Sequence, residues 1–446
     1  MVEEMVCIES NETWSLCDLP AGHRHISLKW VFKEKWNTTG EVIMHKARLV
    51  AHRLRRSVRP GGPPRLHAQE GWEVHHLEVK SAFLNGELEE EAPRAWYAKL
   101  DNSLNTLGFE KCPSNHAVYT RASNSVQLLV GMYVDDLIIT RASTAAITEF
   151  KKEMMALFKL SDLGLLSYYL DIEVDQRVGR IIIAQSSYTG KLLEKAGMAD
   201  CYPVATPMQL CLKLRQEGAG EPVDATYYRS MVGSLRYVTH TRPNITYAVG
   251  YVSRFMEAPT SEHWAAVKQL LRYIASTRQL GCCYAQQVHG AELVGYSDSD
   301  LGGDLDDRKS TSGTIFFLGG SPVSWQSAKQ KIVALSSCEA EYVAAAGAAC
   351  QGIWLRRLIG ELLGRDDGAT RLCIDNKSKH IELRYHFIHQ CVEDDNINVQ
   401  YVRTGDQLAD ILTKALGRTQ FQEMRDRVGV ISGFRETRLV RSVEQM

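Results

Sequence analysis

The chain has 446 residues, of which 44% are hydrophobic and 24% are charged, and its formal net charge is −1. This length and composition are ordinary for two or three globular domains with apolar cores. The near-zero net charge excludes a strong overall attraction to nucleic acid, so nucleic-acid binding has to rest on local basic patches. The 11 cysteines include no C-x-x-C pair, which excludes the usual zinc spacings and is typical of reduced thiols.

No apolar run approaches the roughly 18 residues that a membrane-spanning helix needs. The N-terminal sequence MVEEMVCIES lacks the basic and apolar regions of a secretory signal. We therefore expect an intracellular protein, cytoplasmic or nuclear and not secreted, that has no membrane partner.

The first predicted elements form a hairpin. Leu28–Lys35 and Val42–Val50 are strand-like, and a turn at Asn37–Gly40 joins them. The second strand carries Lys46 and Arg48, whose cationic groups suit phosphate oxygens. The same pattern also fits a solvated strand face.

A basic, Pro- and Gly-rich segment, Arg53–Arg65, follows and is typical of a flexible loop. The next predicted strand, Val74–Val79, carries the acidic residue Glu78 near its end.

The stretch SVQLLVGMYVDDLIIT, residues 125–140, contains two apolar runs that read as strands on either side of Asp135 and Asp136. The acidic pair then lies at the bend of a hairpin, directly after Tyr133 and Val134. Two adjacent carboxylates near a buried sheet repel each other, and a hard divalent cation such as Mg²⁺ would remove that penalty. A solvated Asp-Asp turn is the alternative.

Helical periodicity over Tyr227–Arg272 predicts two or three helices without evident chemistry. Strand signals then return at Leu293–Asp300, at a hairpin that turns at Gly319-Gly320, at Leu372–Ile374 and at Val399–Val402.

Four carboxylates follow strand ends or lie in first helical turns of this region. Ser336 to Glu339 fits a capping box that opens a long Ala-rich helix, and Thr404 to Gln407 fits a second one. Taken singly, each acid reads as a solvated residue or a cap, but together they could converge on two Mg²⁺ ions. The four are Asp298, Glu341, Asp375 and Asp410.

These motifs occur in one order, and together they resemble the reverse transcriptase and ribonuclease H region of the Pol polyprotein of copia-type LTR retrotransposons. The stretches that carry the resemblance are W-V-F-K, K-A-R-L-V, A-P-R-A-W-Y, Y-V-D-D, Y-S-D-x-D, A-L-S-S-x-E-A-E-Y, D-N and Q-L-A-D-I-x-T-K. The resemblance implies an α+β and α/β chain. A palm- and fingers-like polymerase domain spans 1–210, a helical connection 211–288, and a ribonuclease H-like mixed sheet with helices 289–416. A loosely ordered tail spans 417–446.

The resemblance also implies the sites. In the polymerase half, Glu78, Asp135 and Asp136 would be catalytic metal ligands, and Lys46, Arg48 and Tyr133 would contact nucleotide or nucleic acid. In the nuclease half, the catalytic metal ligands would be Asp298, Glu341, Asp375 and Asp410. Each active site would take two Mg²⁺ ions, and the partners would be an RNA template, a DNA primer, an RNA–DNA hybrid and dNTPs.

The sequence also departs from the family pattern. Glu78 stands where the family has aspartate, Glu91 replaces a glutamine, and Asp171 replaces a glycine. Segments of the family pattern are missing near 53–70, 91–92 and 378–379, through deletions or mis-joined exons. Two hypotheses follow. The chain is an RNA-directed DNA polymerase and ribonuclease H with impaired activity, or it is a catalytically dead relict that at most binds nucleic acid weakly.

Overall fold

The computed structural model describes residues 28–36, 42–51, 71–85, 92–123, 126–141, 143–287, 291–364, 368–375 and 386–433. The predicted loop at Arg53–Arg65 and the substitution at Glu91 lie outside these residues. The chain divides into two compact units. The first comprises Met1–His67 and Trp72–Tyr169, and the second comprises Ala68–Gly71 and Leu170–Met446.

The hairpin predicted at the start of the first unit is confirmed. Strands β1 (Leu28–Trp36) and β2 (Val42–Ala51) pair antiparallel, with Lys33 opposite Lys46. Val31 lies opposite Arg48 in the same register.

A six-stranded antiparallel sheet forms the body of the first unit, in the order β4-β5-β6-β7-β3-β8. Its strands are β3 (Glu73–Val79), β4 (Glu110–Lys111), β5 (Val118–Ser123), β6 (Val126–Tyr133), β7 (Asp136–Arg141) and β8 (Leu160–Leu165). The short elements η2 (Ala82–Leu84) and β9 (Tyr168–Tyr169) complete this unit together with α3 (Ala92–Thr106) and α4 (Thr144–Leu157).

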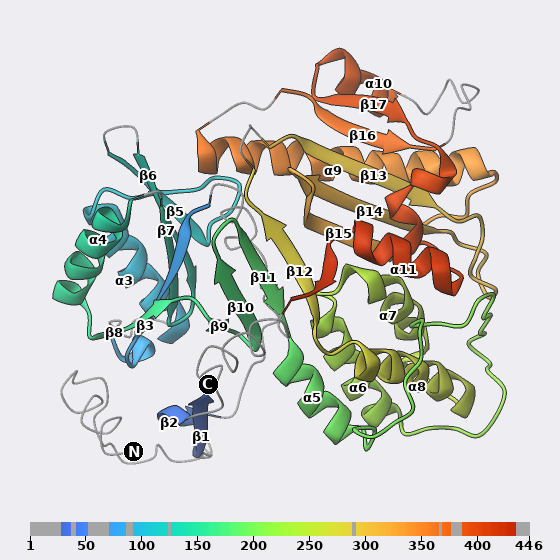
Figure 1. The fold of residues 1–446 in the computed structure, drawn as a ribbon, viewed down its shortest axis with the longest axis horizontal. Helices are drawn as coiled ribbons and strands as arrows, with labels where there is room; N and C mark the ends of the chain where they lie inside the picture. The colour runs from blue at the N-terminus through green and yellow to red at the C-terminus, as the bar shows by residue number, and fades with distance from the viewer. Residues whose placement is uncertain are drawn as a thin grey trace, which may run out of the picture. The chain divides into compact units, whose positions relative to one another are not determined.

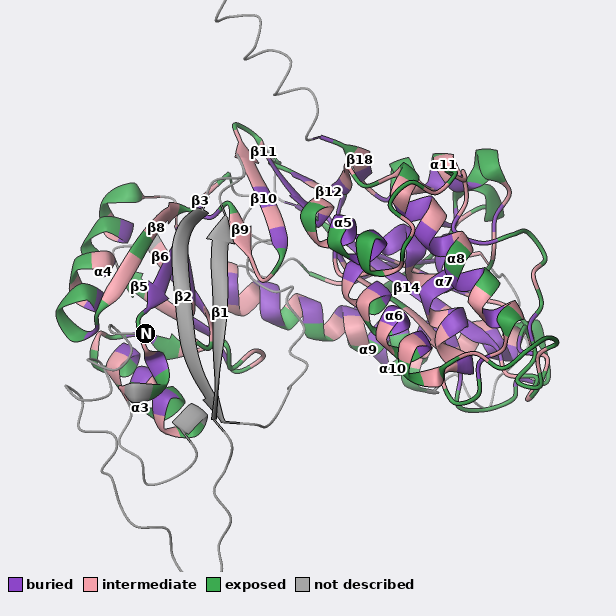
Figure 2. Ribbon diagram, turned by 90° about the horizontal axis from the view of Figure 1, so that it is seen from below, coloured by how far each residue is buried: buried purple, intermediate pink, exposed green. Residues whose placement is uncertain are grey.

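Alternating apolar residues explain how this sheet is covered. Leu77 and Val79 in β3, and Leu137 and Ile139 in β7, are two residues apart and belong to one buried cluster. In a strand such residues share a face, and α3 and α4 lie against it (Figure 1). Figure 2 shows buried and exposed residues alternating along α4, as a helix on one sheet face requires. The opposite face is left to carry the acidic residues.

The second unit begins with a sheet in which β10 (Ile172–Arg177), β11 (Arg180–Ala184), β12 (Leu280–Ala285) and β18 (Val430–Ser432) pair antiparallel in that order. The predicted helices of its middle are confirmed. They are α6 (Ala225–Val238), α7 (Thr246–Val252) and α8 (Ser261–Ser276), with the short η3 (Pro243–Ile245) and η4 (Ser253–Phe255). Helix α5 (Ser186–Lys195) precedes the predicted range.

A mixed sheet in the order β15-β14-β13-β16-β17 forms the rest of this unit. Its strands are β13 (Leu293–Ser299), β14 (Thr311–Leu318), β15 (Ser321–Lys329), β16 (Thr370–Ile374) and β17 (Ile397–Tyr401). The predicted turn between β14 and β15 is confirmed, because Gly319 and Gly320 both have positive φ, 54° and 81°. Helix α9 (Ser337–Leu363) runs along this sheet, and α10 (His386–Glu393) lies beside β17 (Figure 1).

The capping box predicted at Ser336 is confirmed in part, since the Ser336 side chain accepts a hydrogen bond from the backbone N–H of Glu339 at 3.1 Å. The helix predicted to open at Thr404 is wrong. The segment instead forms two short 3₁₀ turns, η5 (Thr404–Asp406) and η6 (Leu408–Leu412). Gln407 between them has ψ 98°, which interrupts any helix, and its side chain bonds to the backbone of Ser297.

The expectation of a loosely ordered tail after Leu416 is wrong for the residues described there. Helix α11 (Arg418–Arg427) buries Phe421 and Met424, and Phe421 packs edge-on against Tyr273 at 5.5 Å. Strand β18 then joins the sheet beside β12. Tertiary burial overrides the polar composition of this stretch.

The predicted combination of sheets and helices is therefore confirmed as a mixed α/β chain, while the four domain boundaries stay a prediction. None of the helices among the described residues combines the length and the hydrophobicity that crossing a membrane requires.

Two consecutive residues between β9 and β10, Leu170 and Asp171, have φ of 48° and 58°. Residues with a Cβ disfavour this region, and glycine does not. We expect Asp171→Gly to raise the free energy of unfolding by about 1 kcal/mol, measured by urea unfolding. Asp171→Ala keeps a Cβ and therefore the unfavourable conformation, so equal stabilisation by alanine would contradict this explanation.

Candidate active sites

The parallel register of β13 and β16 places two of the predicted acids side by side. Tyr296 lies opposite Cys373 in this pair. Asp298 and Asp375 follow two residues later on each strand, at the same level and on the same face of the sheet. Glu341 projects from the start of α9, which packs on this sheet. The fold thus gathers three carboxylates that are 34 or more positions apart in the sequence.

The geometry of this acidic cluster suits a cation. One carboxylate oxygen from each of Asp298, Glu341 and Asp375 lies within 4.8 Å of the others. Asp298 is only 3% exposed. Glu341 accepts a hydrogen bond through Oε1 from the backbone N–H of Ser299 at 3.2 Å, whereas its Oε2 is buried and has no hydrogen-bond partner in the described part of the chain. An orphaned carboxylate oxygen among other carboxylates fits a hard, oxygen-binding ion such as Mg²⁺.

Burial and neighbouring negative charges raise the pKa values of two carboxyl groups in this cluster. Burial, with the nearby charges of Asp298 and Asp375, raises the pKa of Glu341 to about 9. Burial and then Asp298 also raise the pKa of Asp375. Without a cation this cluster therefore retains protons at neutral pH.

The fourth predicted acid, Asp410, lies in η6 and is joined to the cluster through two neighbours. Lys414 Nζ lies 2.9 Å from Asp410 Oδ1 and 3.9 Å from Asp298 Oδ2. The Thr413 hydroxyl donates to Asp298 Oδ2. Burial and the charge of Asp298 raise the pKa of Asp410 to about 7, although Lys414 opposes this rise. The lysine therefore compensates the negative charge where Asp410 and Asp298 approach each other.

Sequence reasoning missed Thr413 and Lys414. Their signal was their spacing, three and four residues after Asp410, which brings side chains together in a helical turn.

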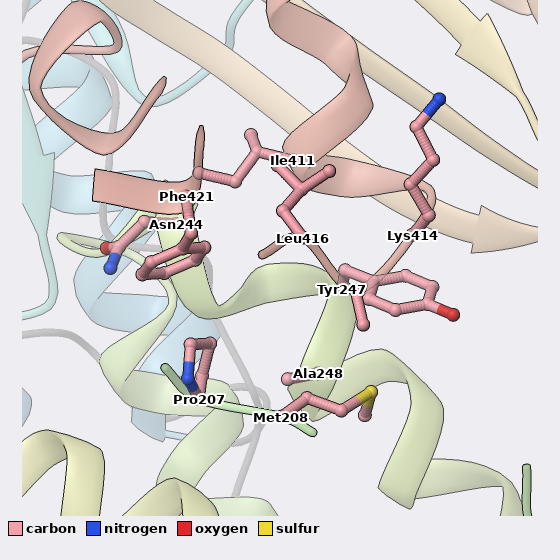
Figure 3. A pocket seen from close by; sticks show the side chains of 10 residues that line it. Pro207, Met208, Asn244, Tyr247, Ala248, Ile411, Lys414, Leu416 and Phe421 are labelled. Atoms are coloured by element: carbon pink, nitrogen blue, oxygen red, sulfur yellow. The ribbon is translucent and has the colours of Figure 1, made fainter. Parts of the chain in front are cut away.

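A small pocket lies next to the segment that carries Lys414. Its lining includes Met208, Tyr247, Leu416 and Phe421. The Lys414 side chain points out of it (Figure 3). The pocket has a volume of about 10 Å³, which is room for about one water molecule. It is too small for a nucleotide.

The first unit places its predicted acids around the β6–β7 turn. Glu78 in β3 lies directly opposite Asp136 in β7, and Asp135 precedes it in the turn. Glu78 is 3% exposed. The Nε2 atom of His76 lies 2.9 Å from Asp136 Oδ1. Among the described residues, only the acidic cluster of the second unit brings three ligand atoms within 4.8 Å, so these three acids do not converge as closely.

Two further contacts fix this turn. The indole N–H of Trp96 donates to the carbonyl of Val134 at 2.6 Å, and the N–H of Val79 donates to the carbonyl of Asp135 at 2.8 Å. The ring of Tyr133 lies edge-on to Tyr169 at 6.3 Å. The side chains of Lys46 and Arg48 lie outside the described part of the structure. Sequence reasoning missed His76 and Trp96, which reach the turn from 60 and 38 positions away.

The acidic cluster predicts a pH-dependent stability. The pKa of Glu341 rises in the fold from 4.5 to about 9. Its contribution to stability is thus complete below about pH 4.5 and is lost as the pH rises toward 9. In metal-free buffer we expect the melting temperature to fall between about pH 5 and 9, and Mg²⁺ to restore it mainly at the higher pH.

Thermal unfolding of the parent and of Glu341→Gln, with and without Mg²⁺, measures this effect. The variant should lose most of the pH slope and of the Mg²⁺ response. Glu292→Gln, which changes an exposed acid directly before β13, serves as the control and should keep both. An unchanged slope in Glu341→Gln would show that another group titrates.

Comparison with known proteins places the chain in a family. Residues 90–210 match the family model described as reverse transcriptase (RNA-dependent DNA polymerase). The chain is 34% identical to the retrovirus-related Pol polyprotein from transposon TNT 1-94 of Nicotiana tabacum, over 97% of this chain and 38% of that protein. It thus spans little more than a third of that relative's length.

Two further similarities differ in strength. The putative transposon Ty5-1 protein of Saccharomyces cerevisiae is 30% identical, over 57% of this chain and 83% of that protein. The N-terminal RNase H domain of a Mycobacterium tuberculosis protein, solved as a fusion with maltose binding protein, is 12% identical. That match covers 30% of this chain and 97% of that one, with a TM-score of 0.21, which is too low to establish a shared fold. The sequence relatives establish that this chain belongs to the reverse transcriptase family of Pol polyproteins from copia-type retrotransposons.

Proposed function

We propose that the second unit is a ribonuclease H-like nuclease that hydrolyses the RNA strand of an RNA–DNA hybrid. The acidic cluster of Asp298, Glu341 and Asp375 carries this proposal. A site that binds divalent cations should retain protons and leave a carboxylate oxygen without a hydrogen-bond partner when no cation balances its charge. The raised pKa of Glu341 and its unpartnered Oε2 atom fit this expectation. The four proposed ligands are Asp298, Glu341, Asp375 and Asp410.

The chain's own residues would prepare this chemistry. The backbone N–H of Ser299 orients Glu341, and the Thr413 hydroxyl orients Asp298. Lys414 sets a positive charge beside Asp410 at the same end of the sheet, where a phosphate would approach. Two bound Mg²⁺ ions would activate a water molecule and stabilise charge on the leaving 3′ oxygen.

The first unit is proposed as a palm- and fingers-like polymerase with impaired activity. Glu78, Asp135 and Asp136 would bind Mg²⁺ and position a DNA primer on an RNA template. Two-metal chemistry needs its carboxylate ligands held to within about half an ångström. The side chain of Glu78 is one methylene longer than the aspartate of the family, which displaces its carboxylate by more than that. The contact of His76 with Asp136 further engages one carboxylate. These two features favour weak polymerisation.

The remaining parts of this proposal concern partners and organisation. Lys46, Arg48 and Tyr133 would contact dNTPs or the nucleic-acid strands. The four domains would be 1–210, 211–288, 289–416 and 417–446. The alignment with the tobacco relative extends over 502 residues although this chain has 446, which supports the proposal that internal segments are missing.

The second candidate function is a catalytically dead relict that binds nucleic acid weakly. The open arrangement of Glu78, Asp135 and Asp136 favours it for the first unit, because these acids do not gather as those of the second unit do.

Cleavage of the RNA strand in a labelled RNA–DNA hybrid tests the nuclease proposal. We expect Mg²⁺-dependent cleavage that falls at least about 100-fold in Asp298→Asn, since changes around metal ligands alone typically cost 10–100-fold. Glu292→Gln should cleave as the parent does. A folded, Mg²⁺-responsive parent without cleavage would refute the nuclease proposal and leave the relict.

Primer extension on an RNA template tests the polymerase proposal. Glu78→Asp shortens the side chain opposite Asp136 and should raise extension by about 10-fold or more, because carboxylate placement limits the metal site. The matched control is Glu73→Asp, which makes the same change at the exposed start of β3. If neither the parent nor Glu78→Asp extends the primer although both are folded, the first unit is catalytically dead.

A further inference from the structure

The turn that carries the acidic pair has a strained backbone. Val134 and Asp135 are the two residues between β6 and β7, and Tyr133 lies opposite Asp136 across the turn. Val134 has φ 57°. A β-branched residue disfavours a positive φ because its Cβ approaches the backbone. The side chain of Val134 is 39% exposed and cannot hold this conformation by burial. Contacts from outside the hairpin must therefore maintain the turn.

Both carbonyl groups of the turn have such contacts. Val79 donates its backbone N–H to Asp135 O at 2.8 Å, which ties the turn to the end of β3. Trp96 donates its indole N–H to Val134 O at 2.6 Å. The first bond is available to any residue at position 79, whereas the second depends on the side chain at position 96.

Trp96 is itself held rigidly. It is 2% exposed, belongs to the core of the first unit, and packs edge-on against Phe158 at a centroid distance of 5.4 Å. Its helix, α3, rests on the same core through Leu100 and Leu104. An indole fixed in this way cannot follow the turn if the turn relaxes. Its N–H instead selects the one peptide orientation in which Val134 O points at α3.

We propose that Trp96 is a positioning residue for the metal ligands of the first unit. By holding the Val134 carbonyl, it keeps the strained turn in the conformation that sets the direction of Asp135 and Asp136. The link to metal binding rests on the proposed polymerase function, but the link to turn geometry does not. Trp96 touches no substrate and would act entirely through the backbone of the turn.

Trp96→Phe removes the N–H and keeps an aromatic ring in the core. We expect amide hydrogen exchange in the peptide spanning residues 131–138 to quicken about 5–10-fold, the effect of losing one hydrogen bond of ordinary strength. Mn²⁺ is then titrated by electron paramagnetic resonance in a full chain whose nuclease cluster is disabled by Asp298→Asn and Asp375→Asn. Its affinity should fall about 10-fold in Trp96→Phe, as it does when outer partners of metal ligands are removed.

Tyr119→Phe is the matched control. Tyr119 is also fully buried in this core and donates its hydroxyl to Asp101, away from the turn. Like Trp96→Phe, the Tyr119→Phe variant loses one hydrogen-bond donor from a buried aromatic ring, so it should lower the overall stability by a similar amount. It should leave the amide exchange of residues 131–138 and the Mn²⁺ affinity unchanged. If Trp96→Phe and Tyr119→Phe change both quantities equally, Trp96 is merely a core residue and the inference is overturned.

Two further outcomes separate this inference from the proposed function. Asp135→Asn and Asp136→Asn report whether Mn²⁺ binds at the turn at all. If neither alters Mn²⁺ binding, the polymerase proposal fails, and the exchange measurement alone decides the role of Trp96. If Trp96→Phe does not fold, Val134→Gly replaces it. That change removes the strain while the Trp96 N–H still holds the turn, so exchange at residues 131–138 should stay the same or slow. Quicker exchange would show that strain does not load this turn and would overturn the inference.

Discussion

Repulsion among one buried and two partly buried carboxylates is the constraint on which the second unit depends. Asp298 and Asp375 lie at the ends of two parallel strands, Glu341 of α9 approaches both, and burial, together with the charges of the two aspartates, raises the pKa of Glu341. A fold keeps such a cluster only if its backbone is fixed by packing elsewhere. Here the packing is supplied by α9, whose buried face is lined by alanines and Gly352.

Gly352 illustrates how that packing acts on the site. A Cβ at this position would lie 3.2 Å from atoms of Phe316 and Thr370, closer than most such contacts. Small residues along α9 thus let the helix approach β14 and β16 closely. That approach carries the first turns of α9, with Glu341, to the strand ends where Asp298 and Asp375 lie. The energy of apolar burial in the helix therefore maintains an arrangement that electrostatics alone would disperse.

The local pattern of apolar and polar residues predicted much of the fold. It failed where a contact with a distant residue determines the secondary structure. Two apolar runs on either side of the acidic pair correctly predicted the β6–β7 hairpin, because consecutive residues of both strands are buried. The helix predicted from Thr404 is replaced by η6 because Gln407, fully buried, donates to Ser297 O at 2.9 Å and accepts from the N–H of Ala409. Likewise, α11 is polar by composition but is anchored by Phe421 on Tyr273.

The two acidic sites show why residue type alone could not decide between them. In both units the acids of the motifs are present, yet Asp298, Glu341 and Asp375 gather and Glu78, Asp135 and Asp136 do not. The parallel register of β13 and β16 brings Asp298 and Asp375 to one level, and α9 adds Glu341. In the first unit the antiparallel register likewise sets Glu78 opposite Asp136, but Asp135 lies in the turn, where the local backbone directs its side chain. The proposed metal site of the first unit would therefore depend on Trp96 and His76, residues that no local motif connects to the acidic pair, and would be sensitive to the added methylene of Glu78.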